Sequence, residues 1–119
     1  MEIINLHIGY EGYPELIFRE KNVKKQIVSE VHVLDFDFYE ILSLIPLGKY
    51  DTKSVMYNYF QCKGWHEGEW ESTRNDEFNN QLILIENMIP QNLLNVYNAV
   101  KQICVSTIQN KNRLFIDLE

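Results

Sequence analysis

Apolar and polar residues alternate along several short stretches of this chain, and a period of two predicts β-strands. Residues 2–8 form the first stretch, one side of which is uniformly apolar, and a turn-forming cluster at residues 9–14 ends it. Residues 16–18 and 26–34 are rich in apolar and β-branched side chains, so they predict two more strands. The alternation returns at residues 113–119 and predicts a closing strand there.

Apolar residues three and four positions apart predict helices in the second half of the chain. Residues 78–89 carry apolar side chains at steps of four, three and four, although the apolar run at 82–85 also suits a strand. Pro90 then stands where the first turn of a new helix tolerates proline. A long amphipathic helix is expected over 93–108, with apolar residues on one face and mostly asparagine, lysine and glutamine on the other.

A capping signal predicts a shorter helix that begins at Asp37. Asp37 and Glu40 have the spacing of a capping box, and Phe36 and Ile41 stand where a hydrophobic staple closes. Pro46 lies close behind the last apolar residue and ends this helix.

The middle of the chain predicts further β-structure. Residues 54–60 alternate and are rich in aromatic side chains, which favours a strand. Residues 63–71 predict a hairpin, in which a two-residue turn places Trp65 directly opposite Trp70. A three-residue loop with Gly68 in the left-handed region shifts this pairing by one, so the register stays open.

The order of these elements predicts an α+β fold. We expect a single domain over residues 1–119, with an antiparallel or mixed sheet of about five or six strands and two or three helices packed on one face. A chain of 119 residues has the length of one domain. Its 45% hydrophobic and 24% charged residues are typical of globular proteins and exclude a disordered chain.

Charge excludes one large class of function. The chain has 17 acidic against 11 basic residues and a net charge of −6, whereas a general DNA or RNA binder needs a basic surface. The N-terminus lacks the basic region of a secretory signal, and no apolar run approaches the roughly 20 residues that cross a membrane. Cys62 and Cys104 form no CxxC pair, so we expect reduced thiols in a cytoplasmic protein.

A histidine and three carboxylates, which are common metal ligands, lie close together in the sequence at His66, Glu67, Glu69 and Glu71. Alternation along a strand turns the side chain of Glu67 to the face opposite His66, however, and one hairpin does not bring three ligands together. We therefore assign no metal ligand and expect a solvated acidic hairpin.

Other residues offer no stronger chemistry. His32, Asp35 and Asp37 are close in sequence, but Asp37 already has a capping role. Cys104 lies on the apolar face of its helix, and Cys62 lacks the elbow motif of a nucleophile. Phosphate-binding glycine loops are absent from the sequence. We assign no catalytic or cofactor-binding residue, we expect no cofactor, and we do not expect an enzyme.

The distribution of acids points to a binding surface. Five acids but only one base lie between residues 67 and 77, next to two tryptophans. Such a segment can be a solvated surface, or it can steer and anchor a basic partner. The candidate partner-binding residues are Trp65, His66, Glu67, Glu69, Trp70, Glu71, Asp76 and Glu77.

The second half of the chain resembles small bacterial immunity proteins, the inhibitors paired with polymorphic toxins, including those of contact-dependent growth inhibition systems. The resemblance is carried by Gly-Glu-Trp-Glu at 68–71, Phe78-x-x-x-Leu82, the long second helix and the final Leu-Phe-Ile-Asp-Leu-Glu at 114–119. It implies a cytoplasmic, non-enzymatic antitoxin that binds one cognate protein toxin and blocks it. Many such toxins are basic nucleases, which an acidic inhibitor suits. No inhibitory residue is carried over by position.

The sequence is also compatible with two other functions. A small enzyme would use His66 with a neighbouring carboxylate, with or without a divalent metal. A structural subunit or adaptor would associate through the strand face that carries Tyr57 and Tyr59. We expect the cognate toxin to be the partner, without direct contact to nucleic acid or membrane.

Overall fold

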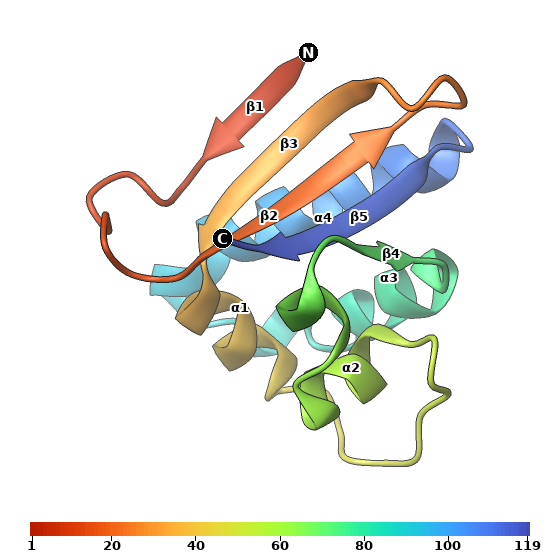
Figure 1. Ribbon diagram of the computed structural model, residues 1–119. Helices are drawn as coiled ribbons and strands as arrows, with labels where there is room; N and C mark the ends of the chain where they lie inside the picture. The colour runs from red at the N-terminus through yellow and green to blue at the C-terminus, as the bar shows by residue number, and fades with distance from the viewer.

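Five strands form one mixed sheet in the computed structural model, which describes residues 1–119. The strands are β1 (Glu2–Asn5), β2 (Glu15–Lys21), β3 (Ile27–Leu34), β4 (Trp70–Ser72) and β5 (Arg113–Leu118). Their order across the sheet is β1-β3-β2-β5-β4, with β1 parallel to β3 and all other pairs antiparallel (Figure 1). The short strands β1 and β4 therefore form the two edges.

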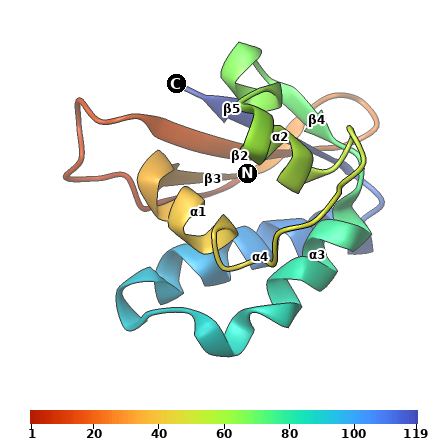
Figure 2. The ribbon, with the colours of Figure 1, turned by 90° about the horizontal axis from the view of Figure 1, so that it is seen from below.

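Most of the helices lie on one face of this sheet, and the others lie beside its β4–β5 edge (Figure 1). The helices are α1 (Asp35–Leu42), α2 (Val55–Gln61), α3 (Asn75–Leu84) and α4 (Leu94–Gln109), with the short 3₁₀-helices η1 (Gly64–Glu67), η2 (Glu86–Met88) and η3 (Gln91–Leu93). From below, α1 and α3 lie beside the long helix α4 (Figure 2). The predicted α+β class is confirmed. No helix has both the length and the apolar character that crossing a bilayer requires.

Alternation along the central strand β2 gives the sheet its two faces. Leu16, Phe18 and Glu20 are fully buried and point toward the helices. Arg19 and Lys21 alternate with Phe18 and Glu20 and point to the opposite, open face, where other charged residues meet them. The sheet thus has an apolar face under the helices and a charged face toward solvent.

The predicted helices and end strands are largely confirmed. The periodic segment 78–89 forms α3 and η2, and the alternative strand at 82–85 is wrong because Leu82 and Ile85 are both buried on one side. The long helix expected over 93–108 is α4. The first strand is shorter than predicted: β1 ends at Asn5, and the chain then turns away from the sheet.

The predicted capping box at Asp37 is wrong. Helix α1 begins two residues earlier, at Asp35, directly after β3, and Leu34 at its N-cap gives no side-chain hydrogen bond. The Asp35 N–H instead donates to the carbonyl of Pro14 at 3.1 Å, so the preceding loop satisfies it. Phe36 is 52% exposed, which also excludes the hydrophobic staple.

The strand predicted at residues 54–60 is a helix, α2. Ser54 is its N-cap, and the Ser54 Oγ accepts a hydrogen bond from the Tyr57 N–H at 3.0 Å. The helix ends at Gln61, and the next residue, Cys62, caps it in the left-handed region with a φ of +50°. A capping serine therefore outweighed the β-propensity of the aromatic residues behind it.

The hairpin predicted at residues 63–71 is also wrong. Trp65 lies in η1 and is fully buried, and Trp70 begins β4, which pairs with β5. The two indole rings still touch, edge to face with centroids 5.6 Å apart. Burying the Trp65 side chain in the core stabilises the protein more than the predicted exposed hairpin would. Gly64 permits the turn, because its φ is +64° and a Cβ there would lie 2.8 Å from Asn58 Oδ1.

We predict that Trp65→Ala lowers the free energy of unfolding by about 3–5 kcal/mol, because it leaves a cavity in the core. Phe36→Ala, at an exposed aromatic position, should change it by no more than about 0.5 kcal/mol. Urea denaturation measures both values. Equally small changes in the free energy of unfolding for the two variants would contradict the burial of Trp65.

Candidate functional site

The eight candidate residues do not gather on one surface. Trp65 is in the core, so it cannot anchor a partner directly, and this prediction is corrected. His66 and Glu67 are exposed on η1. Glu69, Trp70 and Glu71 lie at or next to β4, whereas Asp76 and Glu77 lie in the first turn of α3.

The acids beside β4 are paired with basic residues of the chain itself. Glu69 accepts hydrogen bonds from Arg19 at 2.9 Å and from Lys21 at 2.7 Å. Glu71 accepts two from Arg113, at 2.8 and 2.5 Å. Burial alone would raise the pKa of Glu69, but the hydrogen bonds from Lys21 and Arg19 outweigh it and lower that pKa. These carboxylates therefore belong to the charged open face of the sheet.

Arg19 is the centre of that open face. It also contacts Glu30 at 3.1 Å and Asp117 at 3.2 Å, so three strands meet at one guanidinium. Partial burial lowers the pKa of Arg19, but its hydrogen bonds to Asp117, Glu69 and Glu30 raise it above the usual value. The open face is thus a network in which acids and bases already satisfy one another.

His32 belongs to the same network. Its two ring nitrogens lie 3.1 Å from Glu15 and 2.9 Å from Glu30, and not beside the nearby acids at the start of α1. His66 also lies apart from the acids at β4, and no three His, Cys, Asp or Glu side chains are grouped as metal ligands.

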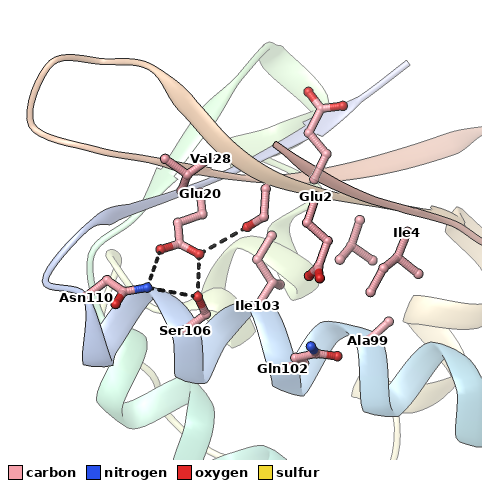
Figure 3. Close-up of a pocket in the computed structure, with 12 residues that line it drawn as sticks. Glu2, Ile4, Glu20, Val28, Ala99, Gln102, Ile103, Ser106 and Asn110 are labelled. Atoms are coloured by element: carbon pink, nitrogen blue, oxygen red, sulfur yellow. Dashed lines mark hydrogen bonds between the residues drawn. The ribbon is translucent and has the colours of Figure 1, made fainter.

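A cavity of about 250 Å³ lies between the sheet and α4 (Figure 3). One end is formed by Glu20, whose carboxylate points to Ser106 of α4 and to Asn110 directly after that helix (Figure 3). Glu20 accepts four hydrogen bonds: from Ser29 at 3.1 Å, Ser106 at 2.7 Å, Asn110 at 3.3 Å and Asn112 at 2.6 Å. All its acceptor sites are therefore used inside the protein.

The pKa of Glu20 reflects these bonds. Burial raises it, but the four donors together outweigh burial and hold the pKa below its usual value. Glu20 thus ties β2 to α4 as a carboxylate without any basic partner, which is a structural role.

A different surface stands out on the helical side. Five rings follow one another across it: His66 and Tyr39 stack with centroids 5.9 Å apart, Tyr39 and Tyr59 lie 5.3 Å apart, Tyr59 and Phe60 5.2 Å, and Phe60 and Tyr50 6.3 Å. We call these five residues the aromatic surface. They come from α1, the loop after it, α2 and η1.

The core places these rings at the surface. Phe38 is fully buried in α1, and the next residue, Tyr39, turns partly outward and is half-buried. Trp65 is fully buried in η1 and packs against Phe38 with centroids 6.0 Å apart, so its neighbour His66 also turns outward. The two outward rings meet, and the Tyr39 hydroxyl and His66 Nε2 are hydrogen bonded.

The aromatic surface contains a depression of about 370 Å³, which we call the aromatic pocket. Its lining residues are Tyr39, Tyr59, Phe60, Cys62 and His66. Asp35 and Trp65 are buried close to it, and neither Asp35 Oδ1 nor Trp65 Nε1 has a hydrogen-bond partner. Unpaired buried polar atoms are costly and call for an explanation.

The electrostatics connect these groups. Burial raises the pKa of Asp35, and nearby His66 opposes the rise. Burial also raises the pKa of Tyr39 to about 12, and the charge of Asp35 adds to the effect. Asp35 is therefore a buried acid whose field reaches the rings of the pocket.

Three further acids lie next to the aromatic surface in the sequence, and we call them the acidic rim. Asp37 and Glu40 lie on α1 within two residues of Tyr39, and Glu67 follows His66. Burial raises the pKa of Asp37, and Glu40 one turn away raises it further. Of the predicted site residues, His66 and Glu67 belong here.

Sequence reasoning missed the four remaining rings of this surface. Tyr59 and Phe60 were expected on opposite faces of a strand, but in a helix they are neighbours. The signal for this helix in the sequence was Ser54, because a serine that precedes such a segment can cap a helix. The adaptor hypothesis loses its basis for the same reason, because it required a strand at Tyr57 and Tyr59.

No protein-family model, curated protein or solved structure matches this chain.

We predict that Glu20→Gln destabilises the protein most at neutral pH, by about 1–3 kcal/mol. Because the folded pKa of Glu20 is lowered, its stabilisation is present above the unfolded pKa near 4.5 and is lost as pH falls from there through the folded value. The difference between wild type and variant should therefore shrink below about pH 4.5.

Denaturation between pH 3 and 8 measures this difference. Glu86→Gln is the control, because Glu86 is an exposed carboxylate that only approaches Lys101. A constant difference between wild type and Glu20→Gln over the whole range would contradict the ionised, hydrogen-bonded carboxylate.

Proposed function

We propose that this chain is a cytoplasmic immunity protein that binds a cognate toxin domain and neutralises it. The toxin is expected to be basic, as a nuclease is. The observation that carries the proposal is the aromatic surface together with the acidic rim. Aromatic side chains dominate the binding energy of many interfaces, and flanking charges set the rate and specificity of association.

The charge of the chain supports a basic partner. The net charge is −6, and the ion pairs on the open face of the sheet engage acids other than the rim. Glu40 and Glu67 are exposed and belong to none of the ion pairs in the structure. They are therefore free to attract positive charge on a partner.

The composition of the surface supports binding to a protein. Tyrosine and phenylalanine are enriched in the centres of protein interfaces, where their rings bury a large area with little loss of side-chain entropy. Phe60 is 41% exposed, and Leu47 nearby is 84% exposed. Both line a second depression, of about 540 Å³, that adjoins the aromatic pocket at Phe60.

A toxin domain is blocked when such a surface covers its active site or its substrate-binding face. A nuclease binds phosphates through lysine and arginine side chains, so its binding face offers the charges that the acidic rim attracts. The toxin can be recovered by co-purification from the native cells, and the first test is whether the chain neutralises its toxicity.

We predict that Phe60→Leu weakens toxin binding about tenfold and reduces protection of cells, because it removes the ring but keeps apolar bulk. Tyr10→Leu, which removes an exposed ring in the loop after β1, should leave both unchanged. Calorimetry measures the Kd and a growth assay measures protection. Equal affinities for wild type and Phe60→Leu would place the interface elsewhere.

We also predict that the double substitution Glu40→Lys and Glu67→Lys slows association with the toxin, most strongly at low salt. Asp76→Lys with Glu77→Lys changes the net charge equally but acts on α3. Stopped-flow association rates at two salt concentrations separate the surfaces. A larger effect of the α3 pair would place the attracting charges on α3 and not on the acidic rim.

A further inference from the structure

The aromatic pocket has the features of a site for a positively charged side chain. Tyr39 and Tyr59 lie 5.3 Å apart, and Tyr59 and Phe60 lie 5.2 Å apart, so their rings form a continuous aromatic lining. The faces of aromatic rings carry partial negative charge and attract a lysine or arginine head group within about 6 Å.

Asp35 adds charge near this lining, because it interacts electrostatically with two of the lining residues, Tyr39 and His66. It is only 5% exposed, its Oδ1 has no hydrogen-bond partner, and the structure contains no ion pair that involves it. A buried acid without a partner is destabilising, and a cation brought into the pocket reduces that cost. Trp65 Nε1, a donor that also lacks a partner, does not favour a cation. The unpaired Oδ1 of Asp35 therefore makes the pocket favour a positively charged ligand.

The chain supplies no cation of its own to this pocket. Lys21 and Arg113 lie over Phe115, with Lys21 Nζ at 4.4 Å and Arg113 Cζ at 5.7 Å from the ring centroid. Lys101 lies over Tyr97 at 5.9 Å. Both of these rings lie outside the pocket, whose lining contains no lysine or arginine.

We propose that the aromatic pocket binds one lysine or arginine side chain of the toxin, held by the faces of Tyr39, Tyr59 and Phe60 and attracted by the nearby buried Asp35 carboxylate. This inference rests on the proposed function and names the chemistry that the partner must present. The Cys62 and His66 side chains complete the lining. An apolar side chain is the competing occupant, because it would gain from the same rings without using Asp35.

The test uses amino-acid amides as probes of the intact protein. The Nα-acetylated amides of arginine and lysine are titrated at constant ionic strength, and the Nα-acetylated amide of citrulline is the neutral analogue of the arginine probe. We expect saturable NMR shifts of amides in α1, α2 and η1 with at least one cationic probe, and binding of the citrulline probe at least about tenfold weaker. Equal binding of the citrulline probe, or no saturable shift with either cationic probe, would overturn the inference.

Variants locate the bound cation. Phe60→Leu and Tyr59→Leu keep apolar bulk without a ring face, and each should weaken binding of the cationic probe several-fold. Asp35→Asn removes the charge at nearly constant volume and should also weaken it, while Tyr10→Leu should have no effect. An unchanged affinity in all three pocket variants contradicts the site.

The same variants separate this inference from the proposed function. If Phe60→Leu weakens toxin binding but no cationic probe binds, the aromatic surface remains the interface and the inference about its ligand fails. If a cationic probe binds in the pocket but Phe60→Leu leaves the toxin affinity unchanged, the pocket is a cation site and its proposed use in toxin binding fails.

Discussion

The fold depends on the edge-to-face contacts of Phe38. This fully buried ring packs against Phe18 of the sheet, Trp65 of η1 and Phe78 of α3, with centroids 5.0, 6.0 and 6.3 Å apart. Each such pair contributes about 0.5–1.5 kcal/mol beyond the burial of its area. Because one side chain joins the sheet to two separate helical elements, α1 cannot shift without disturbing all of them.

The surface on the helical side is a consequence of this core. Phe38 and Trp65 face inward, and their sequence neighbours, the half-buried Tyr39 and the exposed His66, meet at the surface. The opposite face of the sheet has another character, because Arg19 and its carboxylate partners satisfy one another there. The molecule therefore has one surface whose charges are internally paired and another where rings and unpaired acids remain free for a partner.

The sequence predicted the elements in which burial follows a simple period, such as α4 and β5, but it found only residues 16–18 of β2. The prediction from the sequence was wrong at residues 54–71, where a helix cap and the burial of one ring determined the structure and the periodic pattern did not. Ser54 capped a helix, and the core accepted Trp65 as a buried ring. The same failure hid most of the candidate site, because its rings come from separate elements that only the tertiary fold brings together. His66 and Glu67 were predicted, since charge and side-chain type alone marked them.

The most direct test of the account is an NMR cross-saturation measurement on the complex of this chain with its toxin, which maps the residues in contact. We predict that signal loss centres on α1, α2 and η1 around the aromatic surface, with the open face of the sheet unaffected. Signal loss confined to β2, β3 and β5 would contradict the account, because it would make the internally paired charged face the binding surface.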